Sequence, residues 1–203
     1  MSTADTASHA TTALLVVDMQ HGFIDPTDGD GVPGAASVLG AVTHWLVHAN
    51  GNGWPVYLTR DVNPFGKSGP DADRDGGLHP NLAGRGTVVQ KGPGSQAGFS
   101  GFVLASTAMP PGAPGGGGLS ELARLLRSAG VEHLVVVGLA ADVCVSATAI
   151  DARRLGYRVT VDLAATAFVH AHPDGDQAAV TALQQAGVDL LHTDDPTRPG
   201  HEQ

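Results

Sequence analysis

The sequence predicts an α/β fold: a three-layer α/β/α sandwich with a six-stranded, mostly parallel sheet. Short, continuous runs of branched apolar residues recur along the chain, which is typical of parallel strands buried on both faces. Stretches with apolar residues at helical spacing lie between these runs, and several of them stop at a glycine. Strands that alternate with helices form a parallel sheet covered by helices on both faces.

The N-terminal half is predicted to contain three strands and one long helix. Residues 13–17 are wholly apolar and rich in Leu and Val, so they form the first strand. Residues 35–50 carry apolar side chains at helical spacing, and this predicted helix stops at Gly51. The second strand is predicted at residues 54–59, and the Thr-Val-Val run within residues 86–90 predicts the third.

The C-terminal half continues the alternation, and a glycine follows each of its three predicted helices. The first of these helices places four leucines on one side, which predicts a face packed against the sheet. In chain order we expect a helix at 119–129, a strand at 134–137, a helix at 142–155, a strand at 158–163, a helix at 174–186 and a strand at 188–191.

One domain is expected over residues 13–193, with a disordered tail at 1–12 and a second tail at 194–203. The Gly- and Pro-rich stretch 110–118 is interpreted as a flexible loop of this domain, because the chain on either side is too short for two cores. Residues 63–85 are rich in Gly, Pro and Asp and predict a long surface loop, a kind of segment that often lines binding sites.

Composition excludes several classes of function. The 203 residues include 42% hydrophobic ones, and the formal net charge is −9 without any basic run, so we expect no nucleic-acid or membrane partner. A single cysteine rules out an internal disulfide and a cysteine-rich zinc site. The polar N-terminus lacks the layout of a signal peptide, and no apolar run approaches the roughly 20 residues that span a bilayer, so we expect a cytoplasmic protein.

Reactive side chains follow four of the predicted strands. Asp18, Asp61 and Lys91 follow the first three, and Cys144 follows the fourth at the start of a helix. Ligands of open parallel sheets bind beyond the carboxyl ends of the strands, so we expect these side chains to meet there. Taken alone, each has an ordinary explanation: Asp18 can cap a turn, Lys91 can be an exposed strand end, and Cys144 can be a small buried residue.

Together, these residue types supply the parts of an acyl-transfer site. A cysteine in the first turn of a helix lies near the positive end of the helix dipole, which favours the thiolate. Asp18 can take the thiol proton and return it to a leaving amine. The Lys91 ammonium can stabilise both groups, and backbone amides at the helix start can bind an oxyanion. This combination predicts cleavage of a carboxamide through a thioester.

Several segments carry a family resemblance. They are Ala-Leu-Leu-Val-Val-Asp18-Met-Gln20, Val-Gln-Lys91-Gly92, Gly98-Phe-Ser-Gly-Phe102 and Gly138-Leu-Ala-Ala-Asp142-Val-Cys144. Through them, residues 13–191 resemble the isochorismatase-like cysteine hydrolases and are most similar to the nicotinamidases. The resemblance implies the fold predicted above and hydrolysis of nicotinamide to nicotinate and ammonia. The Asp–Lys–Cys triad of the family falls on Asp18, Lys91 and Cys144.

The same resemblance implies the other parts of the site. It implies a non-proline cis peptide between Leu139 and Ala140, which would direct the amides of Ala140 and Cys144 at one oxyanion. Phe23 corresponds to an aromatic wall for a planar substrate ring, and we assign Leu139 to the substrate-binding residues as well. A homo-oligomer is a further expectation, since oligomers are common in the family.

The sequence departs from the family at the divalent-metal site. Nicotinamidases usually have Asp-x-His after the second strand, whereas here Asn63 follows Asp61 in the place of that His, and the expected Trp-Pro-x-His-Cys segment is absent. Zinc prefers imidazole ligands, so we expect no family-type metal and no cofactor, with Asp61, Asn63 and Asp73 as a weak all-oxygen alternative. Because the metal holds the ring nitrogen of nicotinamide in the family, the substrate stays open.

Two other functions remain alternatives to a nicotinamidase-like activity. One is a related amidase of carbamoyl, ureido or maleamate-type substrates, which the altered segment after Asp61 favours. The other is a non-catalytic small-molecule-binding member of the fold, against which the complete triad argues. An isochorismatase proper fits less well, because vinyl-ether hydrolysis in that branch does not use the cysteine.

Overall fold

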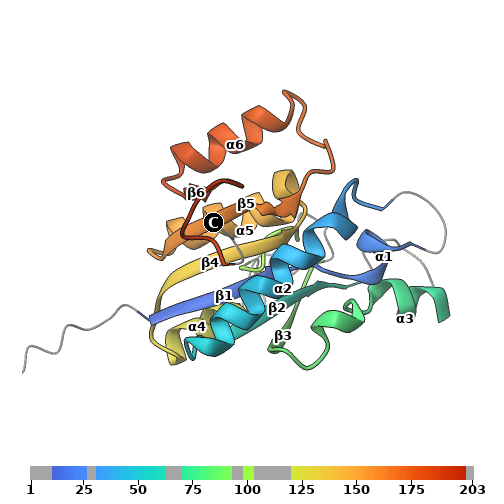
Figure 1. Cartoon of the computed structure of the whole chain (residues 1–203), viewed down its shortest axis with the longest axis horizontal. Coiled ribbons are helices and arrows are strands. Elements are labelled where there is room, and N and C mark those ends of the chain that lie inside the picture. Colours follow the sequence, from blue (N-terminus) through green and yellow to red (C-terminus); the bar gives the residue numbers. More distant parts are fainter. Residues whose placement is uncertain (1–10, 27–30, 63–69, 93–97, 103–119, 200–203) are drawn as a thin grey trace, which may run out of the picture.

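The computed structural model describes residues 11–26, 31–62, 70–92, 98–102 and 120–199. A single six-stranded sheet runs through the molecule in the order β3-β2-β1-β4-β5-β6, and all five neighbouring pairs are parallel (Figure 1). The strands are β1 (Thr11–Val17), β2 (Val56–Asp61), β3 (Thr87–Lys91), β4 (Val131–Leu139), β5 (Arg158–Ala167) and β6 (Asp189–Leu191). The predicted parallel α/β sandwich is therefore confirmed.

Helices cover both faces of this sheet. The long helix α2 crosses one face, and α4 and α5 cover the other (Figure 1). The helices are α1 (His21–Ile24), α2 (Ala35–Gly51), α3 (Pro70–Gly76), α4 (Glu121–Ser128), α5 (Ser146–Arg154) and α6 (Asp176–Gln185), with a 3-10 turn η1 (Pro80–Leu82) and a π-helical turn η4 (Ala141–Val145). Within the described part of the chain, no helix is both long and apolar enough to cross a membrane.

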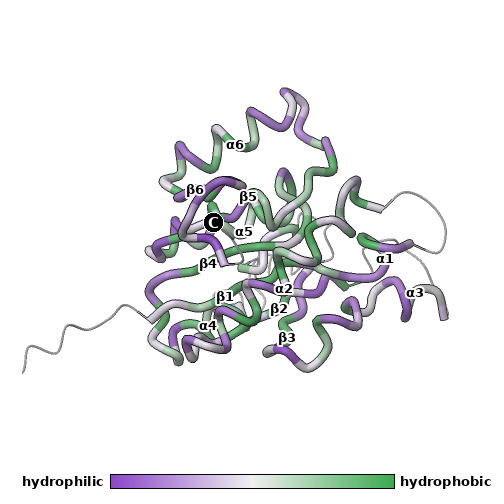
Figure 2. The backbone as a smooth tube through the Cα atoms, viewed as in Figure 1, coloured by the Kyte–Doolittle hydropathy of each residue, from purple (hydrophilic) through white to green (hydrophobic). Residues whose placement is uncertain are grey.

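Two apolar clusters form the core, one on each face of the sheet. Alternate residues of β1 enter opposite clusters, with Leu15 facing α4 and α5 and Leu14 facing α2. Apolar residues accordingly concentrate along the central strands (Figure 2). The continuous apolar sequence of β1 is therefore explained by burial on both sides.

The switch point of the sheet lies between β1 and β4. The chain builds outward from β1 through β2 to β3 and then crosses to β4, so the connections that leave β1 and β4 diverge there. These two strands pair at Gly138, where a side chain would not fit, since a Cβ atom built on it would lie 2.2 Å from the carbonyl oxygen of Val17. Its φ of 110° is also one that residues with a Cβ rarely adopt.

Several elements differ from their predicted bounds. The predicted loop at 63–85 contains α3 and η1, which are too short and too rich in Asp and Gly to show helical periodicity. The helix predicted at 142–155 begins as the π-helical turn η4, and α5 starts only at Ser146. Strand β5 runs on to Ala167, past an irregularity in its pairing with β4. Residues 1–10 of the predicted N-terminal tail and the predicted loop 110–118 lie outside the described residues.

Candidate active site

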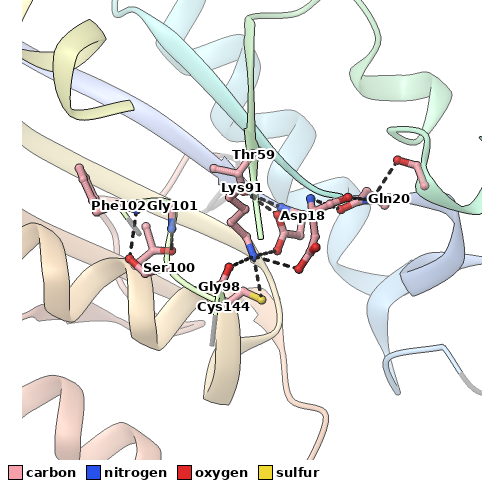
Figure 3. Close-up of polar contacts among 12 residues, drawn as sticks. Asp18, Gln20, Thr59, Lys91, Gly98, Ser100, Gly101, Phe102 and Cys144 are labelled. Atoms are coloured by element: carbon pink, nitrogen blue, oxygen red, sulfur yellow. Dashed lines mark hydrogen bonds and ion pairs between the residues drawn. The ribbon is translucent and has the colours of Figure 1, made fainter. Parts of the chain in front are cut away.

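The candidate active site is centred on the buried ammonium group of Lys91, the last residue of β3 (Figure 3). Its Nζ atom lies 2.8 Å from Asp18 Oδ2, 3.4 Å from Cys144 Sγ and 3.5 Å from Asp61 Oδ2. The side chains of Lys91 and Asp18 are each 1% exposed, so these contacts form away from bulk water. The structure thus brings together the three residues of the predicted triad, and Asp61 with them.

Asp18 lies immediately after β1 in a left-handed backbone conformation with φ of 46°. Such a conformation is uncommon for a residue other than glycine. The hydroxyl of Thr59 on β2 donates to Asp18 Oδ1 at 2.7 Å and accepts the backbone N–H of Asp18 at 3.2 Å. With Oδ1 held by Thr59, the other carboxylate oxygen is the one next to Lys91.

Gln20 joins the end of β1 to the end of β2. Its Oε1 accepts the backbone N–H of Asp61 at 2.8 Å, and its Nε2 donates to the backbone oxygens of Asp61 at 3.1 Å and Gly76 at 2.9 Å. The Gln20 side chain is fully buried, so these hydrogen bonds satisfy groups that water does not reach. They fix the main chain of Asp61, whose side chain contacts Lys91, and they anchor the end of α3.

Cys144 lies in η4, directly beyond the end of β4, and is 7% exposed. The peptide bond between Leu139 and Ala140 is cis, as the family resemblance implied. The backbone oxygen of Ala140 then accepts N–H groups from two residues of the turn, which ties η4 back to the end of β4. Cys144 therefore precedes the α-helix instead of lying in its first turn.

The electrostatics of the site favour a neutral thiol at rest. Burial raises the pKa of Cys144, and the charge of Asp18 raises it further, whereas Lys91 lowers it by a smaller amount. Burial alone would lower the pKa of Lys91, but the negative charges around it outweigh that effect and raise it. Burial and Asp18 therefore favour the neutral thiol beside the Asp18–Lys91 ion pair. This differs from the thiolate expected from a helix start, because burial and Asp18 dominate.

Residues 98–102 close the site beside Lys91. The backbone oxygen of Gly98 lies 3.5 Å from Lys91 Nζ, and the backbone N–H of Gly101 donates to Thr148 Oγ1 on α5 at 3.0 Å. A Cβ atom on Gly101 would lie 3.0 Å from Leu122 Cδ2, so a larger residue there would have to displace its neighbours. This close packing holds the Gly98 carbonyl against the ammonium group.

The residues predicted to bind substrate lie near the same edge of the sheet. Phe23 in α1 is partly buried and packs against the apolar cluster on the α2 side. Leu139 is 1% exposed in that cluster, so a ligand would meet its main chain and not its side chain. Ala140 is 7% exposed. Their roles in binding substrate and oxyanion stay predictions.

Two of the three weak candidates for a metal site lie within the described residues. Asp61 contacts Lys91, Asp73 is exposed on α3, and Asn63 lies outside the described residues. Among the residues that the structure does describe, no three His, Cys, Asp or Glu side chains are grouped so that they could hold a metal ion. The expectation that the chain lacks the metal typical of the family stays a prediction.

Thr59 and Gly98 belong to the site, although the sequence did not predict them. Thr59 lies two residues before Asp61 on β2, so the period of a strand places both side chains on one face. This periodicity could have identified Thr59. Gly98 contacts Lys91 through its backbone oxygen. Every residue has such an oxygen, so the residue type gives no signal for this contact.

One known protein family matches most of the chain. Residues 12–195 match the isochorismatase domain. The chain therefore belongs to the isochorismatase family of hydrolases.

Known relatives within this family include amide-cleaving enzymes. The chain is 32% identical over 204 residues to the nicotinamidase/pyrazinamidase of Mycobacterium tuberculosis, covering 88% of this chain and 97% of that protein. It is also 32% identical over 180 residues to the streptothricin hydrolase of Streptomyces noursei, covering 87% of this chain but only 58% of that longer protein. The structure of PnC1 from L. infantum in complex with nicotinate superposes with a TM-score of 0.68 at 27% identity, covering 91% of this chain and 93% of that one.

Proposed function

We propose that this protein is a cysteine-dependent amidohydrolase that cleaves the C–N bond of a small carboxamide through a thioester on Cys144. The observation that carries the proposal is the contact of one buried ammonium, Lys91 Nζ, with both Asp18 Oδ2 at 2.8 Å and Cys144 Sγ at 3.4 Å. The proposed base and the proposed nucleophile therefore contact the same ammonium group, and proton transfer during attack requires such a base near the thiol. Membership in a family of hydrolases that includes a nicotinamidase/pyrazinamidase relative supports the same chemistry.

In the first step, Cys144 Sγ attacks the carbonyl carbon of the amide while its proton moves to Asp18. Burial and the charge of Asp18 raise the pKa of the thiol, so attack requires a base that takes its proton. The carbonyl oxygen becomes an oxyanion, for which the backbone N–H groups of Ala140 and Cys144 are the proposed donors. Lys91 stays an ammonium and offsets negative charge on its neighbours throughout.

In the second step, the C–N bond breaks and Asp18 returns the proton to the leaving nitrogen, so ammonia departs and a thioester remains. Water then attacks the thioester and gives a proton to Asp18. The C–S bond breaks, the carboxylic acid leaves, and the proton on Asp18 restores the Cys144 thiol. One amide and one water are thus converted to one acid and one ammonia, with the protein unchanged.

Nicotinamide is the first substrate to test, because a relative of nearly the same length is a nicotinamidase/pyrazinamidase. The measurement is ammonia release from nicotinamide, pyrazinamide and a panel of other carboxamides. We expect the wild-type protein to hydrolyse at least one of them and Cys144→Ala to lose about 1000-fold or more in kcat. If no amide is turned over, or if Cys144→Ala is as active as the wild type, the protein is not a cysteine amidohydrolase.

A second candidate is an amidase whose substrate is not nicotinamide. The streptothricin hydrolase and the nicotinamidase/pyrazinamidase are each 32% identical to this chain, but their names give different substrates. In addition, Asn63 occupies the position at which nicotinamidases usually have a metal-binding His. The panel should therefore include streptothricin, maleamate and an N-carbamoyl amino acid, each with and without added Zn²⁺. A lower KM for one of these than for nicotinamide selects this candidate. Activity that persists in a chelator supports the expectation that no metal is needed.

A further inference from the structure

Thr59 contacts the proposed general base twice with a single atom. Thr59 Oγ1 lies 2.7 Å from Asp18 Oδ1 and 3.2 Å from the backbone nitrogen of Asp18. Thr59 is fully buried in β2, and Asp18 is fully buried beyond the end of β1, so water does not compete for these contacts. The same hydroxyl therefore holds both the main chain and the side chain of Asp18.

The chemistry of a hydroxyl fixes the direction of both hydrogen bonds. A threonine hydroxyl has one proton to donate and lone pairs to accept with. The backbone N–H of Asp18 can only donate, so the hydroxyl accepts there, and its proton is available for the carboxylate. Oδ1 is consequently occupied by a donor, and Oδ2 is the oxygen beside Lys91, whose ammonium group also contacts Cys144 Sγ.

The unusual backbone conformation of Asp18 adds to the restraint that Thr59 places on the Asp18 carboxylate. With φ of 46°, Asp18 adopts a left-handed conformation that residues with a side chain seldom adopt. The hydrogen bond from its N–H to Thr59 and the hydrogen bond from Gln20 N–H to its carbonyl oxygen, at 2.7 Å, flank that residue on both sides. The direction in which the Asp18 carboxylate leaves the main chain depends on this conformation.

We propose that Thr59 is a positioning residue, which orients the Asp18 carboxylate so that Oδ2 takes the proton of Cys144. Thr59 does not contact the reacting atoms itself and acts only through Asp18. This inference rests on the proposed amidohydrolase function and adds a residue to it. Because proton transfer requires close approach and correct direction, loss of the hydroxyl should slow the chemical step and leave substrate binding nearly unchanged.

The first test removes the hydroxyl at nearly constant shape. Thr59→Val should lower kcat by about 10- to 100-fold with KM changed by less than about twofold, on the substrate that the amide panel identifies. Thr59→Ser keeps the hydroxyl and should stay close to the wild type. The matched control is Thr160→Val, because Thr160 is a buried threonine on β5 that bonds His133 away from the site. It should leave kcat unchanged.

A second test asks whether Thr59 acts through Asp18 without relying on turnover. Cys144 is the sole cysteine, so its alkylation by iodoacetamide can be followed by mass spectrometry of the intact chain. Thr59→Val should change the alkylation rate several-fold when Asp18 is present. In an Asp18→Ala background, the same substitution should have no effect, because the group that Thr59 orients is gone.

The outcomes separate this inference from the proposed function. If no variant, wild type included, releases ammonia from any amide, the amidohydrolase proposal fails while the alkylation test still decides the role of Thr59. An unchanged kcat in Thr59→Val, or an equal alkylation effect with and without Asp18, overturns the inference. Should Thr59→Val fail to fold, the difference between Thr59→Ala and Thr59→Ser isolates the hydroxyl, and no difference between them also overturns it.

Discussion

At the scale of single residues, the charges around Cys144, the proposed nucleophile, determine how readily its thiol loses a proton. Lys91 contributes one positive charge and contacts two carboxylates, those of Asp18 and Asp61. A thiolate would add a further negative charge beside these two buried carboxylates. Burial and Asp18 both raise the pKa of the Cys144 thiol, so Asp18 has two opposing effects in the proposed mechanism: it disfavours the thiolate, and it accepts the thiol proton.

Asp18→Asn should separate these two effects. The substitution removes the negative charge that raises the pKa of Cys144, while Lys91, which lowers it, remains. The pKa of Cys144 should fall, so the thiolate forms at lower pH and the pH profile of iodoacetamide alkylation should shift to lower pH than in the wild type. Amide hydrolysis should nevertheless drop by about 100- to 10,000-fold, because the asparagine cannot accept the proton. An alkylation profile shifted to higher pH would contradict this account.

At the scale of elements, the pairing of β1 with β4 sets the distance between Asp18 and Cys144, the proposed base and nucleophile. Asp18 follows β1 and Cys144 follows β4, and Val17 pairs with Gly138 where the two strands end. The absent side chain of Gly138 permits this pairing, since a Cβ atom would lie 2.2 Å from the backbone oxygen of Val17. The geometry of the site therefore depends on a glycine that carries no reactive group.

Gly138→Ala tests this dependence. The added methyl must displace β1 or β4, and φ of 110° is unfavourable for alanine, so we expect a loss of more than about 2 kcal/mol in the free energy of unfolding. Urea denaturation measures this loss. Gly40→Ala is the matched control, because Gly40 is exposed within α2 and a Cβ there meets nothing within 4 Å. It should stabilise the protein by up to about 1 kcal/mol. Equal effects of the two substitutions would refute the packing argument.

The elements also show how far the sequence alone can predict the structure. A strand buried on both faces, such as β1, leaves a continuous apolar run, so its position and the strand-end location of Asp18 could be predicted. Helix α3 could not, because seven residues with three aspartates show no apolar period. Nor could the link from Thr59 to Asp18, since it joins residues 41 positions apart and depends on which strands are neighbours. The fold was therefore more predictable than the contacts that orient the site.

At the scale of the whole molecule, the segment after β6 is joined to the core by a buried ion pair. Arg198, which lies in the predicted C-terminal tail, places its Nε 2.8 Å from both carboxylate oxygens of Asp162 on β5. Asp162 is fully buried and also accepts a hydrogen bond of 2.7 Å from Trp45 Nε1 on α2. One carboxylate thus connects the chain end, the sheet and the helix that covers it.

Removal of Arg198 should leave this carboxylate buried without its positive partner. Breaking a buried ion pair on one side typically costs about 3–5 kcal/mol, so Arg198→Met should lower the free energy of unfolding by about that amount in urea denaturation. Adding Asp162→Asn should recover only part of the loss: the neutral amide needs no counter-charge, but its single oxygen cannot replace both carboxylate oxygens, which accept separately from Trp45 Nε1 and the backbone N–H of Ala164. Arg154→Met is the matched control: Arg154 is 74% exposed, and its ion pair with Asp151 should contribute less than about 1 kcal/mol. If the Arg198 variant is no less stable than the Arg154 variant, Arg198 does not contribute to the free energy of unfolding. Trp45 and the backbone would then be sufficient to stabilise the buried carboxylate of Asp162.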